Sequence, residues 1–338
     1  MSKRIAWVDI VRYVCIICVM ATHFSFNNHE LRVIYYPFFL VLFYFCSGYC
    51  YRRKAGFKEH FVSKVKQLLI PWLVFSYGNI LLSGIMSFKE HEGFATELWK
   101  NALQIRGYGD KLWFLSSLFV AYLAFYFVEK RINNKNALWK YLGLLSVLYA
   151  CRELYVFYYD GSAFFWGRPD LPWRLDYLPN MLLYMLFGYA FRHYFEDSFD
   201  KYNTLVLRVL LTVIYLALIN YSFSTDAVFT NILNICFDYV KHLLGSAVVI
   251  AWCKKIKINR YLSFVGQNTL TYFCIHNKFV TLLELVVFAV LPGLETLLIN
   301  NVLAGALGCI IGSLFISVLL IIPTKLFIRF CPKLIGRW

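Results

Sequence analysis

Long apolar runs recur along almost the whole chain and constrain its fold more than any other feature. A helix needs about 20 apolar residues to cross a bilayer, and backbone groups in lipid must be satisfied within the segment. We therefore expect an all-α integral membrane protein, a bundle of about ten transmembrane helices. The apolar runs place these spans at residues 5–26, 34–51, 67–87, 112–128, 140–158, 176–192, 203–222, 230–252, 261–291 and 297–322. The ninth run is too long for one straight helix, and we expect a kink or a re-entrant piece because Asn277 and Lys278 interrupt it.

The basic residues favour one orientation of these spans. Of the 34 Lys and Arg residues, 22 lie in connections assigned to one side and 8 in those assigned to the other. Because Lys and Arg concentrate on the cytoplasmic side of membrane proteins, we expect both the N- and C-termini in the cytoplasm. The net charge of +15 then reflects topology and attraction to anionic lipids, with no nucleic acid as a partner. No connection is long enough to fold alone, so we expect one domain over residues 1–338.

The ten cysteines lie mostly in predicted spans or in cytoplasmic connections, where disulfides are rare. Cys15 and Cys18 form a C-x-x-C pair, but no second pair stands at zinc spacing. We expect a small buried packing role for this pair and no metal site.

Three ionisable side chains, Asp9, Arg12 and His23, fall within the first apolar run. Such groups are disfavoured at bilayer depth by at least ~2.5–3.5 kcal/mol, so they usually face a protein interior or a watery cavity and mark function. In a continuous helix, eleven residues amount to three turns plus about 20°, which would put Arg12 and His23 on nearly the same face. Asp9 lies one turn before Arg12 and is expected to be its counter-ion. The alternative is a self-satisfied Asp9–Arg12 pair between helices, with His23 at the lipid–water boundary.

Further polar residues within the apolar runs are candidates for the same cavity. Arg152 and Glu153 place charge in the fifth predicted span. Tyr272 and His276 are four residues apart in the ninth, so they share one helical face. Interface belts explain most aromatic residues in membrane proteins, so a belt position is the alternative for Tyr272.

Six segments, in order along the chain, resemble motifs of the acyltransferase-3 family of multispanning membrane O-acyltransferases. They are Arg4–His23, Pro37–Phe39 with Phe45–Tyr49, Lys64–Trp72, Leu112–Leu115, Leu186–Tyr189 and Leu262–His276. Together they cover essentially the whole chain, and the chain is most similar to the stand-alone members that O-acetylate fucose or exopolysaccharide. It departs from the usual motifs by having Lys64 and Lys66 where many relatives have arginines, and Thr269 in place of a serine.

The resemblance implies transfer of an acyl group, usually acetyl from cytoplasmic acetyl-CoA, to a hydroxyl of a cell-envelope glycan or lipid-linked saccharide. His23 is then the candidate general base, because an imidazole suits proton abstraction near pH 7. Arg12 would meet the thioester, phosphate or oxyanion oxygens, and Asp9 would orient Arg12. No cofactor would be bound permanently, since acetyl-CoA is a substrate, and the location implied is the bacterial inner membrane.

The resemblance also suggests binding residues. Arg53, Lys64 and Lys66 crowd one predicted cytoplasmic loop, which suits the phosphates of CoA, although plain positive-inside charge explains such a loop equally well. Trp113 suits stacking on a sugar but also an interface anchor. Binding of the acceptor substrate would further involve Arg152, Glu153, Tyr272 and His276. A homo-oligomer is left open.

Two other functional classes remain compatible with the residues alone. A transporter or flippase for a polar or lipid-linked substrate also places Asp, Arg and His in the membrane. A scaffold subunit without activity is the third option. Only the acyltransferase requires acyl-CoA.

Overall fold

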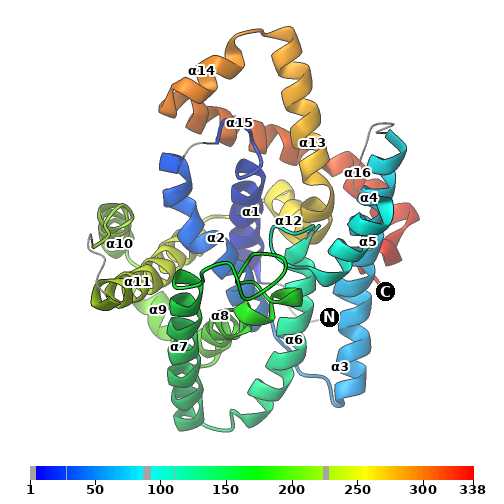
Figure 1. Cartoon of the computed structure of the whole chain (residues 1–338). Helices are drawn as coiled ribbons and strands as arrows, with labels where there is room; N and C mark the ends of the chain where they lie inside the picture. Colours follow the sequence, from blue (N-terminus) through cyan, green and yellow to red (C-terminus); the bar gives the residue numbers. More distant parts are fainter. Residues whose placement is uncertain (1–4, 28, 87–92, 110, 224–227) are drawn as a thin grey trace. The chain divides into compact units, whose positions relative to one another are not determined.

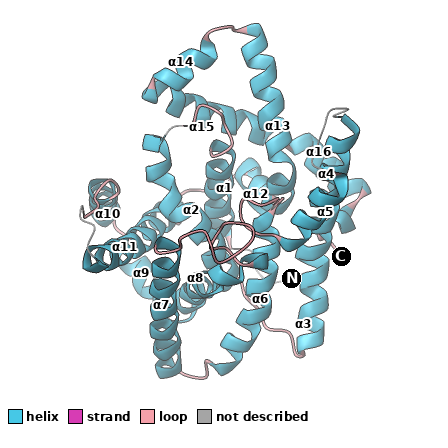
Figure 2. Cartoon of the chain, viewed as in Figure 1, coloured by secondary structure: helices cyan, strands magenta, loops and turns pink. Residues whose placement is uncertain are grey.

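The computed structural model describes residues 5–27, 29–86, 93–109, 111–223 and 228–338. Regular secondary structure is helical throughout this part of the chain (Figure 2). By its internal contacts the chain divides into two compact units. Unit 1 comprises residues 1–46 and 193–326, and unit 2 comprises residues 47–192 and 327–338. A single domain over residues 1–338 remains a prediction.

Unit 1 is built around the first helix, α1, labelled with the other helices in Figure 1. Helix α1 packs against α11, α12, α13 and α15. The helices that lie wholly or partly in unit 1 are α1 (Ala6–Ala21), α2 (His29–Tyr49), α9 (Glu196–Tyr202), α10 (Leu205–Leu218), α11 (Val228–Cys253), α12 (Arg260–Gln267), α13 (Thr269–Val290), α14 (Leu294–Asn300), α15 (Val302–Leu319) and α16 (Ile321–Phe330), with a π-helical turn at Phe191–Phe195.

In unit 2, helix α6 packs against α3 and α8, and α7 packs along α8. The elements of this unit are α3 (Phe57–Lys64), a π-helical turn (Val65–Leu69), α4 (Ile70–Met86), α5 (Phe94–Leu103), α6 (Trp113–Arg131), α7 (Lys135–Phe157), a 3₁₀ segment (Pro172–Tyr177), α8 (Leu178–Ala190) and a 3₁₀ turn (Pro332–Ile335).

Short polar side chains fix where several helices begin. The side chains of Asn134, Thr204, Asn259 and Asn301 each accept a hydrogen bond from a backbone N–H in the first turn of α7, α10, α12 and α15. Asn and Thr are favoured at this position because the first N–H groups of a helix have no partner inside it.

Within the described residues, six helical segments are long and apolar enough to cross a membrane, or seven if one pair bent by 106° counts as a single span. The six are Glu30–Tyr49, Phe57–Leu82, Trp113–Arg131, Phe229–Cys253, Thr269–Val290 and Val302–Phe330. The structure therefore confirms an all-helical protein with several candidate spans. The count of about ten spans and the cytoplasmic termini stay predictions.

The long ninth run is broken, but not where its polar residues suggested. The break separates α12 from α13 at Asn268, whose side-chain Nδ2 donates to the backbone oxygen of Phe264 at 2.7 Å. Asn277 and Lys278 lie inside the continuous helix α13 with exposed side chains. The prediction of an interruption at these two residues was wrong, because exposed polar side chains leave the helical backbone bonds intact.

Candidate functional site

His23 follows the first helix instead of lying within it. Helix α1 ends at Ala21, and the backbone N–H of His23 donates to the oxygen of Met20 at 3.1 Å in the turn that follows. The Oγ1 of Thr22 donates to Val19 O at 2.6 Å, and Nδ2 of Asn27 donates to Ala21 O at 2.7 Å. These bonds satisfy carbonyls that the ending helix leaves without partners.

The predicted helix to residue 26 was therefore wrong at its end. The continuous helix from which a shared face of Arg12 and His23 was expected ends before His23, so that shared face stays a prediction.

The residues after His23 are anchored to two other helices of unit 1. The rings of Phe24 and Phe26 lie against Gly312 and Gly308 of α15, so close that a Cβ at Gly312 would stand 2.5 Å from the Phe24 ring. Between them, the backbone N–H and Oγ of Ser25 donate to Oε1 of Glu284 on α13, at 2.7 and 2.8 Å. His23 is thus held on a turn with fixed neighbours while its own side chain is exposed.

This turn places His23 beside His276 of α13. The two imidazole rings meet edge to face, with centroids 4.8 Å apart and planes at 65°. His276 is 2% exposed, and its Nδ1 lies 2.9 Å from Phe273 O and 3.1 Å from Tyr272 O. Two histidines 253 positions apart in the sequence are therefore neighbours in one unit.

Tyr272 lies one helical turn before His276 and is fully buried. Its hydroxyl donates to the backbone oxygen of Ser317 on α15 at 2.9 Å. The contact joins α13 to α15, so Tyr272 helps to fix the helix that carries His276.

Asp9 lies where α1 meets α12 most closely. The Asp9 side chain is buried, and its Oδ2 accepts a hydrogen bond from Nε2 of Gln267 at 3.5 Å. A Cβ at Gly266 would stand only 2.0 Å from the backbone oxygen of Asp9, so only glycine permits this approach. Arg12 lies one turn further along α1 and is half-buried. The role of Asp9 as its counter-ion stays a prediction.

The predicted CoA-binding residues belong to unit 2. Lys64 is the last residue of α3, and its Nζ lies 3.7 Å from the centroid of the Tyr122 ring. Lys66 lies in the π-helical turn, with Nζ 4.8 Å from the centroid of a Trp338 ring. Arg53 pairs with Glu129 at 3.1 Å.

Lys64 and Lys66 thus stand on helical segments, so their placement in a loop was wrong. Single π-helical turns are frequent at functional sites.

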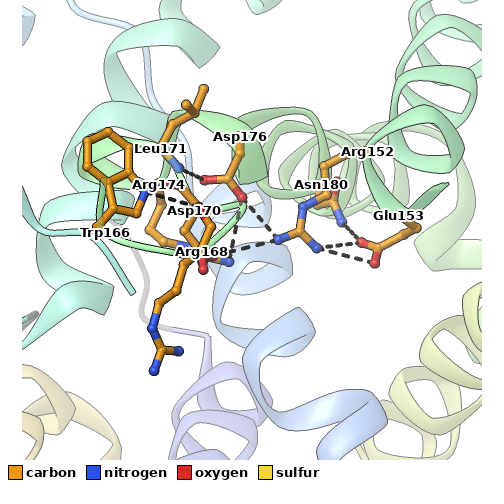
Figure 3. Close-up of polar contacts among 9 residues, drawn as sticks. All are labelled: Arg152, Glu153, Trp166, Arg168, Asp170, Leu171, Arg174, Asp176 and Asn180. Carbon is orange, nitrogen blue, oxygen red and sulfur yellow. Dashed lines mark hydrogen bonds and ion pairs between the residues drawn. The ribbon is translucent and has the colours of Figure 1, made fainter. Parts of the chain in front are cut away.

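Arg152 and Glu153 of α7 belong to a partly buried ionic network in unit 2 (Figure 3). Nη1 of Arg152 donates to both oxygens of Glu153, at 3.0 and 3.2 Å, and Nη2 donates to Oδ2 of Asp176 at 3.0 Å. Nδ2 of Asn180 donates to Oε1 of Glu153 at 2.8 Å, and the other oxygen of Asp176 accepts the Leu171 N–H at 3.0 Å. The terminal nitrogens of Arg152 already have protein partners, so the network ties the 159–177 connection to α7 and α8.

The same connection holds a strained backbone segment next to Trp113. Trp173 and Arg174 both have positive φ, 56° and 57°, in the left-handed region that non-glycine residues seldom adopt. Arg174 is buried and pairs with Asp170, and its guanidinium lies 5.7 Å from the centroid of the Trp113 ring. The guanidinium of Arg106 also lies over Trp113, at 4.8 Å. Strained residues persist where the surroundings hold them, often at binding sites.

The sequence reasoning missed several residues that position the candidate site. Glu284 is an acidic residue in the same apolar run as His276 and could have been weighed as an intramembrane charge. Gly308 and Gly312 form a small-xxx-small pattern, which signals close packing in membrane helices. Asp176 carries no such signal, because it stands in a connection and meets Arg152 only through the fold.

Among the residues that the structure describes, no group of three or more His, Cys, Asp or Glu side chains could hold a metal ion. No curated protein and no solved structure matches the chain. The acyltransferase-3 family model, which describes an acyltransferase domain, matches residues 5–322, nearly the whole chain. Together with its apolar helices, this match shows that the chain belongs to the acyltransferase-3 family of membrane acyltransferases.

Proposed function

We propose that the protein transfers an acetyl group from cytoplasmic acetyl-CoA to a hydroxyl of a cell-envelope glycan or lipid-linked saccharide. The observation that carries this proposal is the exposed imidazole of His23, held on an anchored turn beside His276 in a chain of this family. A sugar hydroxyl is a weak nucleophile, and a positioned base that takes its proton accelerates attack by about 10²–10⁴-fold.

In the proposed reaction, His23 accepts the hydroxyl proton as the sugar oxygen bonds to the thioester carbonyl carbon. The carbon–sulfur bond then breaks, and the departing thiolate takes the proton from the imidazolium. Arg12 is assigned to the oxyanion that forms at the carbonyl oxygen, because a guanidinium supplies charge-assisted hydrogen bonds there. Asp9, buried one turn away on the same helix, is assigned to orient Arg12.

The residues of unit 2 are assigned to binding. Lys64 and Lys66, together with Arg53, would neutralise the phosphates of CoA, with each lysine acting as a point charge. Trp113 offers an aromatic face to a sugar ring. Arg152 and Glu153 would contribute to acceptor binding through the connection that they hold. We assign the protein to the bacterial inner membrane because the family resemblance implies it. We assign its termini to the cytoplasm because its Lys and Arg distribution favours that orientation.

The test uses purified protein in lipid vesicles, radiolabelled acetyl-CoA and envelope glycans, with His23→Ala as the key variant. His193→Ala is the matched control, because it removes another exposed imidazole outside the proposed site. We expect wild type and His193→Ala to label the glycans and His23→Ala to leave them unlabelled. Glycan transport without acetyl-CoA that His23→Ala does not change would instead support the flippase and overturn the proposal.

A further inference from the structure

The hydrogen bonds of His276 determine which of its ring nitrogens carries the proton. Its Nδ1 faces two backbone oxygens, those of Tyr272 and Phe273, at 3.1 and 2.9 Å. A carbonyl oxygen only accepts hydrogen bonds, so Nδ1 must be the N–H donor. In a neutral imidazole the second nitrogen, Nε2, then carries a lone pair and can only accept.

This lone pair is buried without a partner. Within the described part of the chain, Nε2 of His276 has no hydrogen bond, although the residue is only 2% exposed. A buried polar atom without a partner is destabilising, so a fold keeps such an atom only where something compensates for it. Nε2 of His276 is therefore a buried hydrogen-bond acceptor that lacks a donor.

The exposed ring of His23 is suited to be that donor. Its centroid lies 4.8 Å from that of His276, a separation that allows nitrogens of the two rings to come within hydrogen-bonding distance when the exposed ring turns. The turn that carries His23 need not move, because Phe24 and Ser25 anchor it to α15 and α13.

We infer that His276 is a positioning residue whose Nε2 accepts the imidazole N–H of His23. The inference rests on the proposed function, in which His23 is the base, and it adds how that base is oriented. The bond fixes the tautomer of His23, so that its other nitrogen presents a lone pair to the acceptor hydroxyl. When His23 takes the hydroxyl proton, both of its nitrogens carry hydrogen, and Nε2 of His276 stabilises the resulting cation through the same bond. An orienting carboxylate plays this part for catalytic histidines elsewhere.

Three substitutions of His276 separate this role from a packing role. His276→Asn keeps an amide N–H near the position of Nδ1 and removes the acceptor at Nε2. His276→Gln places an amide oxygen near Nε2 and so restores an acceptor. His276→Phe fills the buried site with a ring that has no polar atom, and it serves in place of Asn if that variant does not fold.

Two measurements are made on each variant. The first is the rate at which diethyl pyrocarbonate modifies His23, followed by mass spectrometry of the peptide that carries it. The second is kcat and KM for acetyl transfer. Accepting the His23 N–H raises the electron density on its other nitrogen, so removing the acceptor slows modification. We expect His276→Asn and His276→Phe to slow modification several-fold and to lower kcat by about 10- to 100-fold with KM nearly unchanged, the loss typical when a group that orients a functional histidine is removed. His276→Gln should retain most of the modification rate and most of kcat.

Equal His23 reactivity and equal kcat in wild type, His276→Asn and His276→Phe would overturn the inference. The modification rate needs no acyl transfer, so it decides the inference even if the wild-type protein uses no acyl-CoA. Absence of transfer in wild type, by contrast, would contradict the proposed function.

Discussion

Replacing Gly266 by alanine should separate two helices of unit 1 and impair catalysis more than folding. The new Cβ would stand 2.0 Å from the backbone oxygen of Asp9, whereas close carbon–oxygen contacts are about 3.3–3.6 Å. Helices α1 and α12 must therefore move apart by about 1.3–1.6 Å, the difference between these distances. Overpacking of this kind costs about 1–3 kcal/mol. A displacement of about 1 Å at a catalytic group can cost about 10²-fold in rate, and α1 carries Arg12 and leads into His23.

Gly143→Ala is the matched control for this change. Gly143 also lies within a helix, α7, but its Cβ would meet nothing within 4 Å. Alanine there should be neutral or stabilising by up to about 1 kcal/mol. Thermal unfolding in detergent and acetyl transfer in vesicles measure both effects. Wild-type melting and wild-type kcat in Gly266→Ala would refute the close approach of α1 and α12 as the feature that positions the site.

Three further substitutions test other parts of the structure. Asp176→Ala should lower the free energy of unfolding by about 1.5–3 kcal/mol, because it removes the charge-assisted hydrogen bond from the half-buried Arg152. Asp160→Ala, an exposed carboxylate in the same connection, should change it little, and equal unfolding midpoints would count against the network. Glu284→Ala should lower kcat about tenfold by releasing the turn that carries His23, because each hydrogen bond to a charged group contributes about 1.5–3 kcal/mol. Glu284→Gln keeps a hydrogen-bond acceptor and should retain activity. An equal loss of kcat in both variants would show that the charge of Glu284 matters and not its anchoring of the turn. Arg12→Ala should abolish transfer while the protein stays folded in the membrane, and full activity in this variant would remove Arg12 from the site.

The sequence predicted the class of fold and the type of activity well. Its apolar runs indicated an all-helical membrane protein, and the six ordered motifs indicated the acyltransferase-3 family, which the family match confirms. The apolar runs and the motifs can both be recognised within short stretches of sequence, because hydropathy is summed over about 20 residues and each motif spans a few positions. Neither requires knowledge of which helices touch.

The sequence did not predict the details that depend on side-chain hydrogen bonds and tertiary packing. Periodicity extended the first helix to residue 26, but the side chains of Thr22 and Asn27 end it at Ala21. The predicted break at Asn277 lies instead at Asn268, where a side-chain bond replaces a backbone one. The pairing of His23 with His276 joins residues from opposite ends of the chain, and no pattern within either segment predicts it.

The most direct test of the account is the O-acetyl content of envelope glycans in cells that carry either the wild-type protein or His23→Ala at equal membrane levels. Mass spectrometry of the isolated glycans reads this content without knowing the acceptor beforehand. The account predicts acetylated glycans with the wild-type protein and none of that modification with His23→Ala. Equal acetylation in both strains, or its absence in both, would contradict the account.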